Sequence, residues 1–181
     1  TELKVTPGPL VELCDVGQGG FVAGKVTAGS IDKGLDLDFG EANATGKALV
    51  EPRGEALRSS CNLKGGDLPA RGMLLRFSFP FDAQGWQWHK DMQTAVPINE
   101  NRVYENVRPL RAYADLPEWK DQPDLRMGYS NRNFCTALTG PVGLCLAVPI
   151  DKPCIFRTAY DGEAKWLEIV YDLPLSPDTR R

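Results

Sequence analysis

The sequence predicts an all-β, antiparallel β-sandwich of the supersandwich or jelly-roll-like kind, with long loops in the middle third of the chain. Two observations favour this class. The 181 residues include 18 Gly and 14 Pro, a density of turn formers that suits short strands better than long helices. Apolar residues also alternate with polar ones along several short segments, which is the period of a strand with one buried face. The length fits a single domain spanning residues 1–181.

Three short apolar segments predict strands in the first third of the chain: residues 10–13, 20–26 and 35–39. Strict alternation in the third segment places its three apolar side chains on one face and two aspartates on the other. Residues 52–71 lack a sustained period, so we expect them to form a connection, with a short helical turn near residues 55–60 as an alternative.

The clearest strand of the chain is residues 73–82, where Leu75, Phe77, Phe79 and Phe81 share one face. Its Pro80 indicates a sheet edge or the end of the strand, because proline cannot donate a hydrogen bond to a neighbouring strand. The polar, turn-rich region that follows, residues 83–133, is expected to form long functional loops between short strands.

The last third of the chain predicts a four-strand antiparallel meander. Its strands are expected at residues 134–138, 144–148, 155–160 and 165–173. Asp161-Gly162 between two alternating runs is a strong local signal for a hairpin.

Composition excludes several function classes. The net charge of −3 and pI of about 5.3 provide no basic field for nucleic acid, and no apolar run reaches the ~20 residues needed to cross a bilayer. Five cysteines without a CxxC motif favour neither a disulfide framework nor a zinc site. In an antiparallel hairpin Cys135 and Cys145 could lie on facing strands, but a disulfide there is not favoured, because cross-strand geometry often misses the required dihedral.

One histidine, His89, excludes a multi-histidine metal site, and no nucleophile motif accompanies it. We therefore expect no metal and no cofactor, and we assign no catalytic residue. Carboxylates in the loop-rich middle leave open a self-contained glycoside hydrolase or lyase, since such enzymes need a pair of acids. These acids are Glu100, Glu105, Asp115, Glu118 and Asp121.

The strongest candidate site follows the phenylalanine-rich strand. Trp86 and Trp88 are two residues apart, so in an extended segment both indoles project to the same side and form an apolar platform for a sugar ring. His89 and Asp91 would bond the sugar hydroxyls. Aromatic residues from the same region complete the predicted ligand-binding set: Trp119 and Tyr129. The alternative is that the two tryptophans anchor the core.

Short motifs in the second half of the chain resemble the N-terminal β-sandwich, of the galactose-mutarotase-like type, found in large bacterial glycoside-hydrolase-like proteins. The resemblance covers residues 75–181 and is carried by segments 79–88 (FPFDAQGWQW), 137–141 (ALTGP), 143–144, 147–149, 160–161, 172–173 and 175–179. Such sandwiches usually precede a larger catalytic domain. The chain ends where that pattern continues into a further strand and a second domain, which favours a fragment of a multidomain protein.

The expected function is a carbohydrate-associated module that binds or positions a glycan for a polysaccharide-degrading enzyme. Its partners would be a polysaccharide or oligosaccharide and an adjacent catalytic domain, with neither nucleic acid nor membrane involved. A non-catalytic part of such a protein is favoured over an enzyme, and a secreted or periplasmic location over a cytoplasmic one. The alternative is a purely structural domain that packs on a catalytic neighbour.

Overall fold

The computed structural model describes residues 11–30, 33–65, 70–109, 129–152 and 154–175. Within these ranges lie sixteen strands and one short 3-10 helix, η1 (Gly40–Ala42). The strand pairs run antiparallel, and the predicted all-β antiparallel sandwich class is confirmed. No helix in the described ranges has the length and apolar character needed to span a membrane.

The chain divides into two compact units. The sandwich unit comprises Thr1–Gly8 and Arg76–Asp172, and the hairpin unit comprises Pro9–Leu75 and Leu173–Arg181. Two strands pass from one unit to the other: β7 (Arg71–Pro80) and β16 (Trp166–Leu175). The single domain over residues 1–181 stays a prediction.

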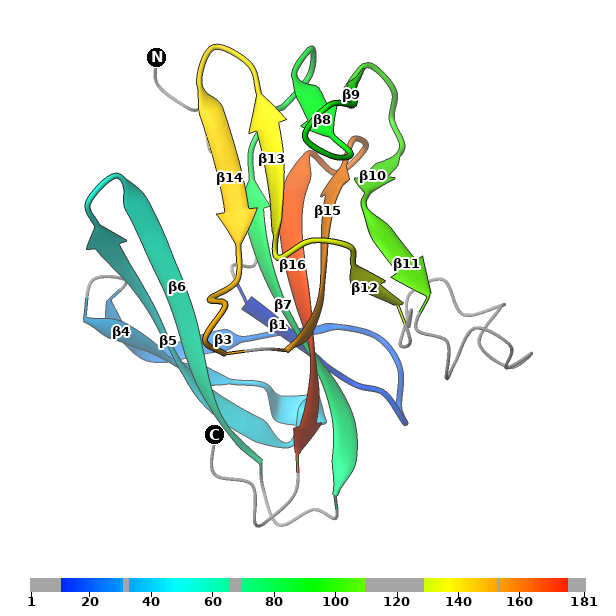
Figure 1. Ribbon diagram of the computed structural model, residues 1–181. Helices are drawn as coiled ribbons and strands as arrows, with labels where there is room; N and C mark the ends of the chain where they lie inside the picture. The colour runs from blue at the N-terminus through cyan, green and yellow to red at the C-terminus, as the bar shows by residue number, and fades with distance from the viewer. Residues whose placement is uncertain (1–10, 31–32, 66–69, 110–128, 153, 176–181) are drawn as a thin grey trace. The chain divides into compact units, whose positions relative to one another are not determined.

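The hairpin unit contains a four-stranded sheet that Figure 1 draws from blue to teal. Its strands, in spatial order, are β3 (Lys25–Ser30), β4 (Gly34–Asp38), β5 (Ala44–Arg53) and β6 (Ala56–Gly65). The alternation predicted for residues 35–39 is confirmed, since Leu37 and Phe39 are buried while Asp36 and Asp38 are exposed. The strand predicted over residues 20–26 is instead interrupted at Gly24, between β2 (Val22–Ala23) and β3.

Residues 52–71 were expected to form a connection, and the structure corrects this. Strands β5 and β6 pair over ten positions and are joined by a two-residue turn, Gly54-Glu55. Gly54 has a φ of 63°, which suits glycine at the first central position of a tight hairpin turn. The strand pattern was missed because most side chains of β6 are exposed or half-buried on both faces, so no apolar alternation marks it.

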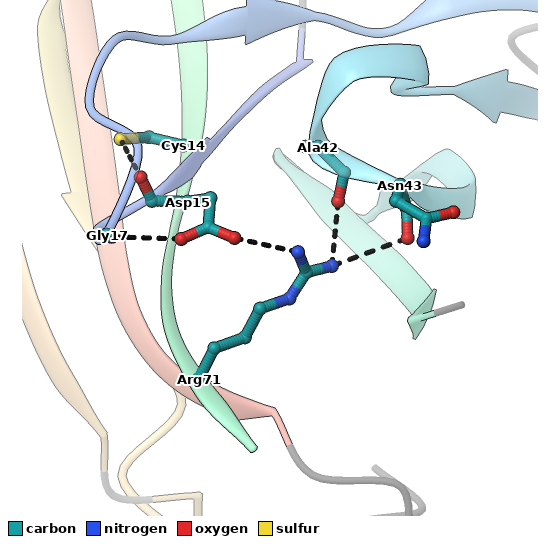
Figure 2. A network of polar contacts seen from close by, with 6 residues as sticks. All are labelled: Cys14, Asp15, Gly17, Ala42, Asn43 and Arg71. Carbon is teal, nitrogen blue, oxygen red and sulfur yellow. Dashed lines mark hydrogen bonds and ion pairs between the residues drawn. The ribbon is translucent and has the colours of Figure 1, made fainter. Parts of the chain in front are cut away.

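An ion pair in the hairpin unit joins three of its segments (Figure 2). Arg71, at the start of β7, donates from Nη1 to Asp15 Oδ2 (2.7 Å) and from Nη2 to the Ala42 carbonyl (2.7 Å) and the Asn43 carbonyl (3.3 Å). Asp15, in β1 (Val11–Asp15), also accepts from the Gly17 amide. Both charged side chains are largely buried, at 12% and 10% exposure, so each needs these partners to offset lost hydration.

The sandwich unit contains two sheets and a short separate strand pair. One sheet runs β10 (Val103–Glu105), β15 (Ile155–Asp161) and β16, with β7 beside β16; the other runs β14 (Gly143–Ala147), β13 (Cys135–Thr139), β8 (Gln87–His89) and β9 (Ala95–Pro97). The separate pair is β11 (Val107–Pro109) with β12 (Tyr129–Asn131).

One apolar cluster receives side chains from both of these sheets. Its buried members are Phe81, Ala83, Trp86, Trp88, Ile98, Tyr104, Leu138, Tyr160 and Leu167. Because Trp88 and Leu138 come from one sheet while Tyr104, Tyr160 and Leu167 come from the other, the cluster is the filling of a two-sheet sandwich.

The strand predicted over residues 73–82 is β7, and Pro80 is its last residue, which confirms the strand-end alternative. The four-strand meander is wrong: β13–β14 and β15–β16 are both hairpins, but they belong to different sheets. A turn in which the Lys152 amide donates to the Pro149 carbonyl separates them. The hairpin at Asp161-Gly162 is confirmed, with Asp161 Oδ1 accepting the amides of Glu163 and Ala164.

Candidate functional site

Both tryptophans of the predicted sugar platform lie in the core of the sandwich unit. Trp88 is 1% exposed and Trp86 is 8% exposed, and Trp86 meets Phe81 edge-on with ring centroids 5.2 Å apart. The prediction that both indoles project to the same side holds only in the sense that both enter one apolar cluster. An indole buried to this degree has no face to offer a sugar ring, so the exposed platform is corrected to a core anchor.

The polar edge of Trp88 is satisfied inside the protein. Its Nε1 donates to Asn106 Oδ1 (3.0 Å), and Asn106 Nδ2 donates in turn to the backbone carbonyl of His89 (2.7 Å). Asn106 thus secures the end of β8 from the chain between β10 and β11. Sequence reasoning missed this residue, because its partner lies 18 positions away and no local pattern connects them.

The turn between β13 and β14 covers the indole ring of Trp86. A methyl group placed on Gly140 would lie 2.5 Å from Cε2 and 2.8 Å from Cγ of Trp86. Such distances are far inside van der Waals contact, so the backbone at Gly140 already rests on the indole. The glycine in the ALTGP motif therefore has a packing role.

The residues on either side of Trp88 point the other way. Trp88 pairs with Leu138, and Gln87 pairs with Thr139; since side chains alternate along a strand, Gln87, His89 and Thr139 share the opposite face. His89 Nε2 and Thr139 Oγ1 lie 2.9 Å apart in a hydrogen bond on this side. We call this side of the β14–β13–β8–β9 sheet the outward face.

Small side chains surround these polar groups on the outward face. Besides two cysteines, the cross-strand registers place five further residues there, four of them glycine or alanine and one proline: Ala95, Pro97, Ala137, Gly143 and Ala147. Two cysteines, Cys135 and Cys145, occupy the remaining positions of the β13–β14 pair. All of these residues are exposed or half-buried, so the outward face presents hydroxyl, imidazole, amide and thiol groups with little bulk between them.

Asp91 shapes the loop between β8 and β9. Its Oδ1 accepts the amides of Gln93 (2.8 Å) and Thr94 (2.6 Å), the pattern by which an aspartate stabilises a turn. These two backbone hydrogen bonds lower the pKa of the Asp91 carboxyl. The structure thus places Asp91 in a turn beyond the end of β8, with its Oδ1 bonded to the loop.

The remaining predicted residues are placed only in part. Trp119 lies outside the described residues, and Tyr129 lies in β12 opposite Pro109. Among the middle-loop acids, Asp115, Glu118 and Asp121 also lie outside the described residues. Glu100 forms an ion pair with Arg102, in which Oε2 and Nε lie 2.8 Å apart.

The sandwich unit also has a buried charged pair, with one residue on β15 and the other on β16. Arg157 and Asp172 are 9% and 11% exposed, with Nη2 and Oδ1 3.3 Å apart. Burial raises the pKa of Asp172 to about 6, although the charge of Arg157 acts to lower it. Asp172 Oδ1 receives no hydrogen bond among the described residues, so ionisation of this carboxyl is poorly compensated.

The described residues hold no cluster of three or more His, Cys, Asp or Glu side chains suited to a metal ion. Comparison with known proteins yields no match to a protein-family model, to a curated protein or to a solved structure. The resemblance to the galactose-mutarotase-like sandwich accordingly stays a prediction carried by its sequence motifs.

Proposed function

We propose that the chain is a carbohydrate-associated, non-catalytic module whose outward face, rather than its tryptophans, meets the glycan. The hydrogen-bonded pair of His89 and Thr139 is the observation that carries this proposal. The pair lies on a sheet face flanked by small side chains, so a ligand lying along the strands could reach it without displacing bulky groups.

The chemistry of the outward face suits neutral hydroxyl groups. A threonine hydroxyl donates and accepts, a glutamine amide offers both functions, and a neutral imidazole carries one donor and one acceptor. A sugar presents hydroxyls that also do both. Gln87 and Thr139 carry no formal charge, which favours an uncharged polyhydroxylated ligand.

Carbohydrate is favoured over other neutral ligands by the motifs that resemble glycoside-hydrolase-associated sandwiches. The same resemblance supports a role beside a catalytic domain, with a polysaccharide or oligosaccharide as the bound partner. Because the two indoles are buried in the core, stacking on them adds nothing to affinity in this proposal, and hydrogen bonds provide the contact.

The test is a glycan-array screen of the wild-type chain, followed by titration of any glycan that binds. The double variant His89→Ala/Thr139→Val should bind at least about tenfold more weakly, since each lost hydrogen bond is worth about 1 kcal/mol. Thr27→Val is a matched control: its hydroxyl donates to the Asp36 carbonyl on an exposed strand of the hairpin unit, so binding should not change. Equal binding by the double variant would refute the outward face as the site.

A purely structural module is the second candidate, and the burial of Trp86 and Trp88 favours it. In that case the aromatic segment serves the core alone, and the module supports a neighbouring domain. A wild-type chain that binds no glycan on the array, together with a Trp88→Phe variant that loses stability, would favour this candidate over the first.

A further inference from the structure

Two cysteines lie diagonally across the β13–β14 hairpin. Cys135 pairs with Ala147 and Cys145 pairs with Ala137, so the cysteines are offset by two positions on neighbouring strands. Residues in these positions point to the same side of the sheet. That side is the outward face, where Cys145 is exposed and Cys135 is half-buried.

The register brings the two thiols near each other. Burial is the largest cause that raises the pKa of the Cys145 thiol, and the neighbouring Cys135 raises it further. The hairpin thus holds two neighbouring thiols at a place that solvent reaches from the Cys145 side.

We propose that Cys135 and Cys145 form a reversible intrachain disulfide when the protein meets a small-molecule disulfide such as oxidised glutathione. The exposed Cys145 thiolate attacks one glutathione sulfur, which breaks the glutathione disulfide and releases one glutathione thiolate. The Cys135 thiolate then attacks Cys145 Sγ, forming the protein disulfide and releasing the second glutathione. The two released thiolates take up the two protons that the cysteines lose, so the exchange balances.

The diagonal position explains why this bond would be reversible. Diagonal neighbours in an antiparallel pair have Cα atoms about 7–8 Å apart, whereas disulfides usually need less than about 7 Å. Forming the bond requires a small shift of one strand, and strained or exposed disulfides are the more easily reduced ones. The raised pKa of Cys145 makes the first step slow at neutral pH and faster as pH rises.

The other described cysteines supply internal comparisons. Cys14 is buried and Cys61 is half-buried, with burial raising the pKa of Cys61 to about 11. Cys154 is exposed but lies outside the β13–β14 pair. Cys154 is therefore the matched control: it meets the same oxidant without a partner cysteine across a strand.

The experiment equilibrates the full chain with a series of reduced-to-oxidised glutathione ratios, traps free thiols by alkylation and maps peptides by mass spectrometry. We expect a peptide pair linked through Cys135 and Cys145, about 2 Da lighter than its two thiol forms, which disappears when reduced glutathione is in excess. Cys154→Ser should leave that linkage unchanged, and Cys145→Ser should abolish it.

Two results would overturn the inference. One is full alkylation of both cysteines at ratios where Cys154 already carries glutathione. The other is an oxidised form that contains only mixed disulfides or covalent dimers. The measurement on the wild-type chain decides the matter even if a serine variant fails to fold. The inference needs only the register of one hairpin, so it stands apart from the proposed function.

Discussion

Replacing Gly140 with alanine tests the packing of the turn on Trp86. The added methyl group would lie 2.5 Å from Trp86 Cε2, whereas carbon atoms in ordinary contact are at least about 3.5 Å apart. Either the turn or the indole must therefore move by about 1 Å. The indole has little freedom, because it is 8% exposed and lies edge-on against Phe81.

The expected cost follows from these contacts. Overpacking a well-filled core costs about 1–3 kcal/mol, and the lower entropy of the unfolded alanine chain offsets about 0.4–1 kcal/mol of this. We expect Gly140→Ala to lower the free energy of unfolding by about 1–2 kcal/mol, which corresponds to a fall in Tm of about 2–8 °C for a chain of this size. Urea titration followed by tryptophan fluorescence, with a thermal melt alongside, measures both.

Gly143→Ala is the matched control, since a methyl group there meets no atom within 4 Å. It should change stability by less than about 0.5 kcal/mol. A Trp86→Leu background should shrink the cost of Gly140→Ala, because the clashing ring is gone and the two sites are in contact. If Gly140→Ala proved as stable as Gly143→Ala, the turn would not rest on the indole, and the packing role assigned to Gly140 would be refuted.

Two further predictions concern buried charges. Burial raises the pKa of Asp172 to about 6 from a usual 3.8. The stabilising contribution of this carboxyl is therefore full below about pH 4 and is lost as pH rises through about 6. Urea unfolding of the wild type from pH 4 to 8 should show the free energy of unfolding fall by about 3 kcal/mol from this cause, and Asp172→Asn should lack that fall. Arg71→Ala strands the Asp15 carboxylate and should cost about 3–5 kcal/mol in urea unfolding; Arg53→Ala, which breaks an exposed pair with Glu51, should cost under about 1 kcal/mol.

Strands with one buried face could be predicted from the sequence because their signal is local. The segment from Leu35 to Phe39 alternates in sequence and also alternates in burial. The hairpin at Asp161-Gly162 was likewise predictable, since its turn residues lie between two regular runs and Asp161 bonds the amides that follow it.

Two kinds of information were beyond the sequence pattern. Strands β5 and β6 form the longest described hairpin of the hairpin unit, yet the exposure of both faces of β6 removed the apolar alternation that would have marked it. Strand partners were also undetermined, because alternation shows that a segment is extended without showing which neighbour it joins. The four-strand meander failed for that reason.

The candidate site shows the same division. Two tryptophans two positions apart share a side, but their spacing does not say whether that side faces solvent or core. The pairing of Trp88 with Leu138 decides it, and Leu138 lies 50 positions further along the chain. Because of this long-range pairing, the expected sugar platform is a core anchor, and the residues that face outward are its sequence neighbours Gln87 and His89.

A single alternation underlies both proposals made for the sandwich unit. Once Trp88 and Leu138 face the core, alternation requires His89 and Thr139 to face outward, and the β13–β14 register carries the two cysteines with them. A slip of one residue in β13 would reverse Leu138, Thr139 and Cys135 relative to their partners on β8 and β14. The hydrogen bond between His89 and Thr139 depends on the β8–β13 register, and the diagonal placement of the two cysteines depends on the β13–β14 register. The sugar-contact test and the disulfide test therefore share one structural premise, that Thr139 and Cys135 lie on the outward face of β13, and they examine it by unrelated chemistry.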